Sequence, residues 1–294
     1  MLTSLLSFYI AGNLNQNLEG DGSKQFASLS LNNILENTES PIKDPSLISP
    51  ILGAEGIIAI DRKSGETLYG DNIHKRLSIA SITKLMTMLI IVEENKLDEV
   101  VAVSENASST PGSTMYLRPG EKITVENLLY GAVINSANDA AVALAEHNAG
   151  SVSAFVEKMN NRALELGMVN THYQNPIGLD SLNNYSSAYD VAKLADFIYH
   201  NSFISEAAQI KNLSVKSTNG SYVHKLESTN ELLGSYLHIK GLKTGKTDAA
   251  GLCLVSVAEN DEGHEIITVV LNSPARFKES KILIDWVFRA FKWY

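Results

Sequence analysis

One lysine in an otherwise apolar stretch is the first residue of this sequence whose type and place suggest chemistry. Lys84 is the single charged residue between Ile79 and Val92. A helix of this length spans about 21 Å, too short for a bilayer core of about 30 Å, so we expect a buried soluble helix. Burying an unpaired ammonium costs several kcal/mol. One way to avoid this cost is a lowered pKa, which keeps the amine neutral.

Ser81 lies three residues before Lys84 and therefore on the same helical face. A serine beside a desolvated amine has the arrangement of a nucleophile next to its general base. The start of that helix would also present backbone N–H groups where an oxyanion forms. The spacing equally fits a capping serine and a lysine that reaches solvent, and Ser40-Pro-Ile-Lys43 repeats it in a polar region, so it needs independent support.

Two further short motifs give that support. Lys243-Thr244-Gly245 ends a strand pattern, and such a tripeptide is rarely met by chance. Ser136-Ala137-Asn138 lies between two predicted helices, in the order along the chain that the chemistry requires. Ser-x-Asn is weak by itself, so the three motifs count only together.

In this order, Ser-x-x-Lys, Ser-x-Asn and Lys-Thr-Gly resemble the motifs of the penicillin-recognising serine acyl-transferases. The surrounding segments are similar to the low-molecular-mass D-alanyl-D-alanine carboxypeptidases, and the resemblance covers residues 51–294. These segments are IASITKLMT around Ser81, SANDAAVALAE around Ser136, LGMVNTHYQNPIGLD at 166–180, YSSAYDVA at 185–192 and GLKTGKTDAAG at 241–251.

The resemblance implies a role for each motif residue. Ser81 would attack the peptide carbonyl between two D-alanines and form an acyl-enzyme, while Lys84 takes its proton. Ser136 would relay a proton to the leaving amine, and Asn138 would hold Lys84 and the substrate amide. The backbone N–H groups of Ser81 and Lys246 would form the oxyanion hole.

The resemblance also assigns the residues that bind the terminal carboxylate of the substrate. Lys243, Thr244, Gly245 and Lys246 would line one strand of the site, and the ammonium of Lys243 would lower the pKa of Lys84. Arg276, just before the last helix, matches the carboxylate-binding arginine of the family, although a solvated arginine at a helix start is the plainer alternative.

The elements that must position these residues follow from hydrophobic periodicity. A β-hairpin opens the unit, helices fill its middle, and strands return near its end, which predicts an α+β fold. The resemblance makes this a β-lactamase/transpeptidase-like fold, an antiparallel sheet of N- and C-terminal segments packed by helices, with a helical subdomain. The predicted strands are 56–60, 66–70, 240–243, 252–258 and 265–271, and the predicted helices are 81–94, 125–134, 139–149, 152–166, 188–200 and 277–292.

Composition limits the partners. Lys and Arg number 24 against 33 Asp and Glu, so the net charge is −9 and no basic surface for nucleic acid is expected. The single cysteine, Cys253, excludes an internal disulfide and a multi-cysteine metal site, and its apolar neighbours predict a buried thiol. No clustered ligand motif indicates a metal, and we expect no cofactor.

The N-terminal region has a different composition. Residues 1–12 are apolar but lack the positive charges of a secretory signal, because no Lys or Arg precedes Lys24. We interpret 1–12 as a clipped signal or anchor, 13–50 as a polar tether and 51–294 as the catalytic domain. By the resemblance, the protein acts outside the cytoplasm on peptidoglycan stem peptides and is inhibited covalently by β-lactams, and any membrane attachment would be N-terminal.

Rival functions share parts of this pattern. A D,D-endopeptidase that cuts cross-links uses the same residues and differs in cleft shape. A serine β-lactamase needs the glutamate of a Glu-x-x-Leu-Asn loop, but Leu179 stands three residues before Leu182-Asn183. A non-catalytic scaffold of the penicillin fold is disfavoured by the intact motifs, and a Ser-His-Asp hydrolase by the absence of Gly-x-Ser-x-Gly.

Overall fold

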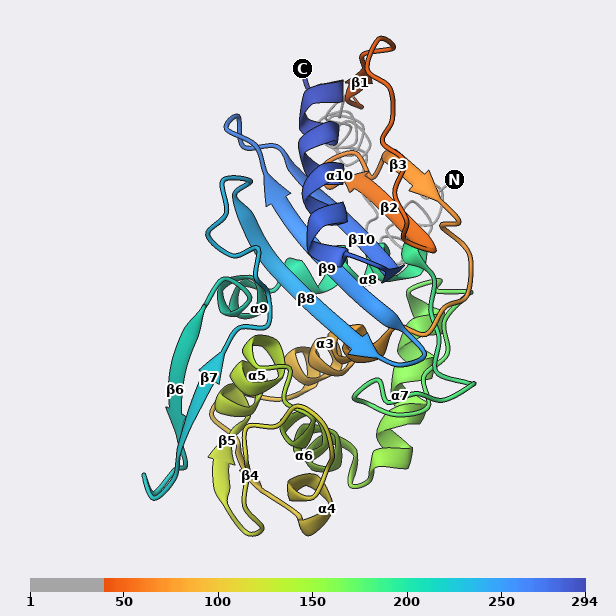
Figure 1. Ribbon diagram of the computed structural model, residues 1–294. Coiled ribbons are helices and arrows are strands. Elements are labelled where there is room, and N and C mark those ends of the chain that lie inside the picture. The colour runs from red at the N-terminus through yellow and green to blue at the C-terminus, as the bar shows by residue number, and fades with distance from the viewer. Residues whose placement is uncertain (1–39) are drawn as a thin grey trace, which may run out of the picture. The chain divides into compact units, whose positions relative to one another are not determined.

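A five-stranded antiparallel sheet lies at the centre of the residues that the computed structural model describes, 40–294 (Figure 1). Its strand order is β3-β2-β10-β9-β8, so an N-terminal hairpin pairs with three C-terminal strands. The sheet confirms the predicted assembly from both ends of the chain. Its strands are β2 (Gly56–Asp61), β3 (Thr67–Asp71), β8 (Ile239–Thr247), β9 (Gly251–Glu259) and β10 (Glu265–Ser273).

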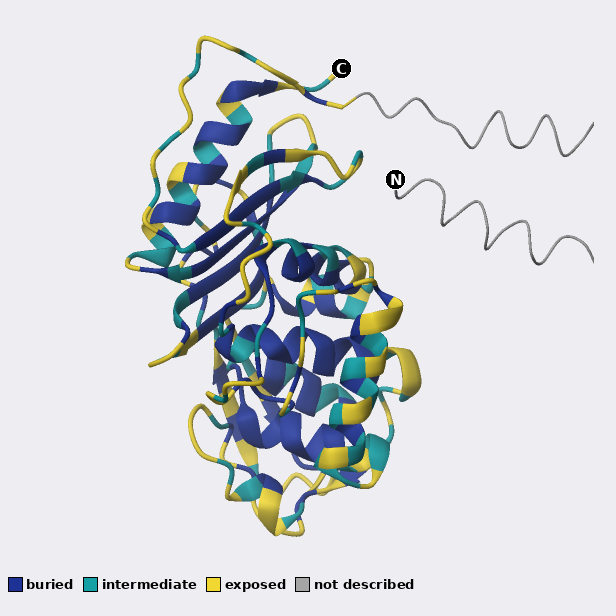
Figure 2. Cartoon of the chain, turned by 90° about the vertical axis from the view of Figure 1, so that its right-hand side faces the viewer, coloured by how far each residue is buried: buried dark blue, intermediate teal, exposed yellow. Residues whose placement is uncertain are grey.

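Both faces of this sheet are buried at its three central strands, which explains why β2, β10 and β9 are nearly continuous apolar runs. Successive residues of a strand point to opposite faces. On β9, Val255 and Val257 join the larger core beneath the helices, whereas Leu254 and Ala258 join a smaller core under α10 (Arg276–Ala290). Figure 2 shows the buried strands between these two layers.

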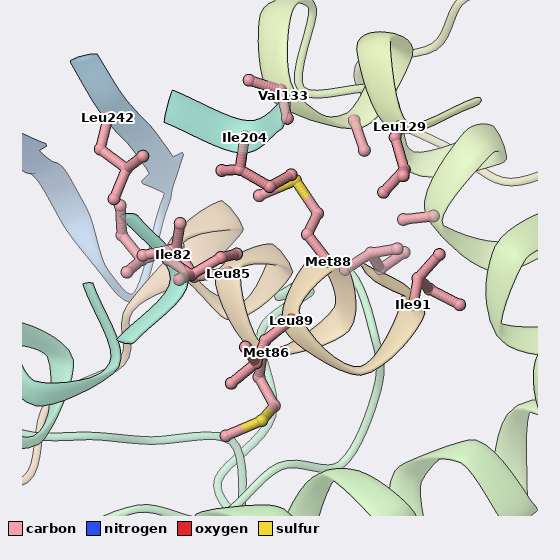
Figure 3. Close-up of a cluster of buried hydrophobic side chains, with 14 of the residues drawn as sticks. Ile82, Leu85, Met86, Met88, Leu89, Ile91, Leu129, Val133, Ile204 and Leu242 are labelled. Atoms are coloured by element: carbon pink, nitrogen blue, oxygen red, sulfur yellow. The ribbon is translucent and has the colours of Figure 1, made fainter. Parts of the chain in front are cut away.

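A helical region covers the other face of the sheet, with α3 (Lys84–Glu94) at its centre. The apolar side chains around α3 come from several elements (Figure 3): Leu129 and Val133 from α5, Ile204 from α9 and Leu242 from β8. The remaining helical elements are the 3₁₀ turn η1 (Ala80–Thr83), α4 (Glu105–Ser108), α5 (Val125–Ile134), α6 (Asn138–Ala149), α7 (Val152–Glu165), α8 (Ala188–Tyr199) and α9 (Ser202–Ala207). None of the helices between residues 40 and 294 is long and apolar enough to cross a membrane.

The predicted α+β class and the six predicted helices are confirmed, with differences at their ends. The first helix begins as the 3₁₀ turn η1 rather than as a regular α-helix. The last helix stops at Ala290 and not at Lys292, because β11 (Phe291–Lys292) pairs with β1 (Ile42–Lys43). Periodicity missed two small sheets of paired short strands: β4 (Val100–Ala102) with β5 (Lys122–Thr124), and β6 (Asn212–Lys216) with β7 (Val223–Glu227).

The folded unit begins earlier than hydrophobic patterning indicates. It runs from Ser40 to Tyr294, so it includes residues 40–50, which the sequence analysis assigned to the tether. Those residues are mostly exposed, and the β1–β11 pairing holds Ile42 and Lys43 through main-chain hydrogen bonds that leave no hydrophobic pattern. The predicted segment 1–12 and residues 13–39 of the predicted tether lie outside the described residues.

Candidate active site

Ser81 and Lys84 lie on consecutive turns where η1 leads into α3. The Nζ of Lys84 donates to Ser81 Oγ at 2.9 Å and to the Ile177 carbonyl oxygen at 2.9 Å. Ala80, directly before the serine, has φ +48, a left-handed conformation that non-glycine residues avoid. Such strain persists where the surrounding structure enforces it, typically at functional sites.

Lys84 is fully buried, as the sequence predicted for the charged residue of an apolar helix. Burial holds the pKa of Lys84 well below its usual range, and the nearby cation Lys243 lowers it further. The carboxylate of Asp139 opposes this shift. In its neutral form, an amine 2.9 Å from a serine hydroxyl can accept the hydroxyl proton.

A loop that sequence reasoning did not assign to the site holds Lys84 in place. Asn175 Oδ1 accepts hydrogen bonds from the backbone N–H groups of residues 177, 178 and 179, which fixes the Ile177 carbonyl that binds the lysine. Gly178, at φ +85, approaches the serine turn so closely that an added Cβ would lie 1.9 Å from the Ala80 carbonyl oxygen. The segment was noted as a family resemblance, but no pattern marks a backbone carbonyl as a lysine partner.

A second serine–lysine pair faces the first from across the site. Lys243 on β8 donates to Ser136 Oγ at 2.7 Å and to the Thr244 carbonyl oxygen at 3.0 Å. Ser136 occupies the turn between α5 and α6 with φ +56. Burial, reinforced by the charge of Arg276, lowers the pKa of Lys243 to about 7.

Strand β8 runs directly beside the nucleophile. A Cβ added to Gly245 would lie 3.2 Å from the backbone nitrogen of Ser81 and 2.9 Å from the Ile79 carbonyl oxygen, so only glycine fits here without movement. Lys246, the next residue, is exposed. The predicted pair of N–H donors, Ser81 and Lys246, therefore belongs to two segments in close contact, as an oxyanion hole requires.

Thr244 has a partner that the sequence analysis did not identify. Its Oγ1 lies 2.5 Å from Oγ1 of Thr229, in the segment between β7 and β8. Thr229 carries no motif, and only the fold brings it to the Lys-Thr-Gly strand. One hydroxyl donates to the other, so the contact leaves one hydroxyl hydrogen free to bind an anionic group.

Arg276 begins α10 and reaches back to the same strand. Its Nη1 donates to the Gly245 carbonyl oxygen at 2.6 Å, and its guanidinium carbon lies 4.7 Å from the centre of the Phe277 ring. The single hydrogen bond leaves other guanidinium N–H groups for a ligand. The solvated alternative of the sequence analysis does not describe this partly buried, anchored side chain.

Asn138 makes contacts other than the one the resemblance implies. Its Nδ2 donates to the Pro111 carbonyl oxygen at 2.6 Å, and its backbone N–H donates to the Ser113 carbonyl oxygen at 2.6 Å. Among the described residues, Asn138 Oδ1 is buried without a hydrogen-bond partner. That oxygen is left to accept from an incoming amide or from Lys84, so its predicted role stays a prediction.

Cys253 plays no part in this arrangement. It is fully buried on β9, as its apolar neighbours predicted, and burial raises the pKa of its thiol to about 11. A thiol in that state is a poor nucleophile, so Cys253 belongs to the core.

The site thus brings together two serines, two buried lysines and a strand, β8, whose Gly245 lies against the backbone of Ser81. Residues 45–275 match the family model described as D-alanyl-D-alanine carboxypeptidase. The chain belongs to this family. The D-alanyl-D-alanine carboxypeptidase DacF of Bacillus subtilis is 36% identical over 81% of this chain and 63% of its own length.

Other members of the D-alanyl-D-alanine carboxypeptidase family show the same relation. DacC of Escherichia coli is 34% identical over 83% of this chain and 63% of its own length. This chain therefore spans less than two thirds of these curated relatives. The crystal structure of the Streptomyces K15 DD-transpeptidase superposes with a TM-score of 0.77 at 32% identity and covers 82% of this chain and 99% of its own.

Proposed function

We propose that this protein is a serine D-Ala-D-Ala carboxypeptidase that removes the terminal D-alanine from peptidoglycan stem pentapeptides through an acyl-enzyme on Ser81. The observation that carries the proposal is the fully buried Lys84 amine, 2.9 Å from Ser81 Oγ and with a lowered pKa. Membership in the family supports the substrate class.

In the first step the neutral amine of Lys84 takes the hydroxyl proton of Ser81, and Oγ attacks the carbonyl carbon of the penultimate D-alanine. The developing oxyanion binds to the backbone N–H groups of Ser81 and Lys246. The C–N bond then breaks, and the leaving amine receives a proton through Ser136. Charged Lys243, 2.7 Å from Ser136 Oγ, lowers the cost of moving that proton.

In the second step water adds to the ester of Ser81. Lys84 takes a proton from the water, the Oγ–C bond breaks, and the proton returns to Oγ, which frees the shortened peptide and restores the enzyme. A β-lactam would be attacked in the same way. Its ester would persist because Leu179 stands where a deacylating glutamate would be needed, and this separates the proposal from a β-lactamase.

The carboxylate of the terminal D-alanine lies, on this proposal, against Thr244, Thr229 and Arg276. Arg276 is anchored to Gly245 by one hydrogen bond and keeps further N–H groups for the carboxylate. Lys243 adds a positive charge nearby. Asn138 Oδ1, buried and unpaired within the described chain, accepts a hydrogen bond from the substrate amide.

We place this activity outside the cytoplasmic membrane, because peptidoglycan lies there. Apolar residues 1–12 are the part of the sequence that we propose as its membrane attachment. Fractionation of cells that produce the full chain and a chain lacking residues 1–12 tests this. Equal distribution of the two forms between membrane and soluble fractions would contradict the attachment.

Covalent labelling with a fluorescent penicillin tests the central step. The wild type should carry one label per chain, and Ser81→Ala should carry none. The control is Ser40→Ala, since Ser40 opens another Ser-x-x-Lys match but precedes a strand. Label on Ser81→Ala, or no label on the wild type, would refute the proposal.

Products separate the carboxypeptidase from its nearest alternatives. Mass analysis should show loss of one alanine from a pentapeptide muropeptide and little cleavage of a cross-linked dimer. Predominant cleavage of the dimer would assign a D,D-endopeptidase, and fast multiple turnover of nitrocefin would assign a β-lactamase.

A further inference from the structure

A buried histidine–glutamate pair lies beside the site and takes no part in the steps described above. His224 is on β7 and Glu121 directly precedes β5, and their side chains are 5% and 0% exposed. His224 Nε2 lies 2.7 Å from Glu121 Oε1, and His224 Nδ1 lies 2.7 Å from the carbonyl oxygen of Met115. Both ring nitrogens therefore face protein oxygens and not solvent.

The two contacts together fix the number of protons in the pair. A carbonyl oxygen only accepts, so His224 Nδ1 must carry hydrogen to bind Met115. The other nitrogen then bonds to Glu121 only if it also carries hydrogen or if the carboxyl is protonated. Either way, the pair holds one proton more than a neutral histidine and an ionised glutamate.

The other polar groups around the pair have partners of their own. Glu121 Oε2 accepts from the backbone N–H of Arg118 at 3.1 Å, and the Arg118 guanidinium lies 4.8 Å from the centre of the Tyr222 ring. Asp139 of α6 lies beyond Met115 and accepts its N–H at 3.0 Å. Because the Arg118 N–H bonds to Oε2, the shared proton remains the partner of Oε1, the Glu121 oxygen that faces His224.

Met115 connects the pair to the turn that carries Ser136. The carboxylate of Asp139, in the first turn of α6, accepts from the N–H groups of Met115 and Leu117 at 3.0 Å each. Asn135 Nδ2 donates to the Thr114 carbonyl oxygen at 2.8 Å. Segment 113–117 is thus bound on one side to His224 and on the other to the residues on both sides of Ser136.

We propose that His224 and Glu121 are positioning residues whose shared proton holds segment 113–117 against the turn that carries Ser136 and Asn138. The inference rests on the proposed function, because acylation of Ser81 measures its effect. Without this shared proton, His224 can bind Met115 or Glu121 but not both. Segment 113–117 is then held less firmly on its His224 side, and proton relay through Ser136 slows.

Glu121→Gln is the sharpest test, because glutamine supplies the missing hydrogen. Its amide N–H donates to the lone pair of a neutral His224, and its oxygen accepts from the Arg118 N–H, so the support should no longer depend on a shared proton. His224→Gln should instead weaken the hold on Met115. His147→Gln is the matched control, since His147 lies 2.9 Å from Glu99 in a partly exposed pair.

Rates of acylation by a fluorescent penicillin, measured across pH, give the first readout. The ratio of the Glu121→Gln rate to the wild-type rate should rise toward alkaline pH. His224→Gln should slow acylation roughly tenfold, the loss expected for about one hydrogen bond, and His147→Gln should match the wild type. Equal pH profiles for Glu121→Gln and wild type would overturn the inference.

Nitrogen NMR of the His224 ring gives a second readout that needs no acylation. The wild type should show a proton-sharing ring with hydrogen at or near both nitrogens, and Glu121→Gln a neutral ring with hydrogen on Nδ1 alone. A neutral Nδ1–H ring opposite a fully ionised Glu121 in the wild type would overturn the inference even if no acylation were seen. Failure of the proposed function alone would instead abolish acylation in every variant and leave the ring signals as expected.

Discussion

The two serine–lysine pairs of the site have the same composition and different construction. In each, a buried lysine bonds to a serine hydroxyl and to one main-chain carbonyl. Ser81 and Lys84 belong to one continuous helical segment, whereas Ser136 and Lys243 meet across the site from the α5–α6 turn and from β8. Local geometry therefore builds the first pair, and the tertiary fold builds the second.

The pairs also differ in the charge that each lysine meets. Burial is the main cause of the lowered pKa in both, but Lys84 is opposed by Lys243, and Lys243 by Arg276. The positive charges of Arg276, Lys243 and Lys84 thus form a series. Arg276 lowers the pKa of Lys243, and Lys243 lowers the pKa of Lys84, which lies beside the nucleophile. We infer that Lys84 works as the neutral base and Lys243 as the charged partner.

Lys84→Arg should reduce acylation more than any other substitution that tests these two roles. A guanidinium stays protonated and cannot accept the Ser81 proton, so acylation by penicillin should fall roughly 10²- to 10⁴-fold. Stopped-flow labelling measures the rate, and the melting temperature shows whether the variant is folded. Acylation within tenfold of wild type in a folded variant would remove Lys84 as the base.

Arg276→Ala tests the end of the charge series. Loss of a donor to a charged group costs about 1.5 to 3 kcal/mol, so kcat/KM on an acyl-D-Ala-D-Ala peptide should fall roughly 10- to 150-fold. Wild type should discriminate strongly against the C-terminal amide of this peptide, and the variant much less. The same preference for the free acid in both proteins would show that Arg276 does not contact the carboxylate.

Lys243→Arg should have a smaller effect, because its positive charge remains. Loss of about one of its two hydrogen bonds predicts a decrease in acylation of roughly 2- to 12-fold. Parallel measurement with Lys84→Arg sharpens the comparison. If both substitutions reduce acylation by the same factor, the two lysines do not have separate roles.

The pH dependence of stability gives the smallest and most specific effect. Because the pKa of Lys243 is lowered to about 7, the folded protein binds fewer protons than the unfolded chain from about pH 7 to the ordinary lysine range. The cost of burying this lysine is full below pH 7 and declines as pH rises.

Lys243→Met should therefore increase the free energy of unfolding more at pH 6 than at pH 9. Urea unfolding at both values measures the difference, with Lys225→Met, at an exposed residue of β7, as the control. A gain that grows toward pH 9 would contradict the lowered pKa.

The sequence predicts the first pair well because its geometry is local. Ser81 and Lys84 needed only helical spacing and an apolar neighbourhood, and the decoy Ser40-Pro-Ile-Lys43 shows why both conditions matter. Lys43 lies on strand β1, where residues three apart point to opposite faces, and it bonds to Ser49 instead.

Sequence patterns could not predict the contacts that form only when the tertiary fold brings distant segments together. Thr229 and the Ile177 carbonyl carry no motif, since a hydroxyl or a carbonyl becomes a partner only where distant segments meet. The two-stranded sheets β4–β5 and β6–β7 were missed because strands of three to five residues show too little alternation.

The order of strands in the sheet has a consequence for how the protein folds. Strand β2 pairs along its length with β10, about 200 residues later in the chain, and Arg276 follows β10. Contacts this distant in sequence slow folding, because a long loop must close before they form. A ribosome must therefore release the chain through β10 before the central sheet can close, and we expect nascent chains that end before β10 to be unreactive toward penicillin.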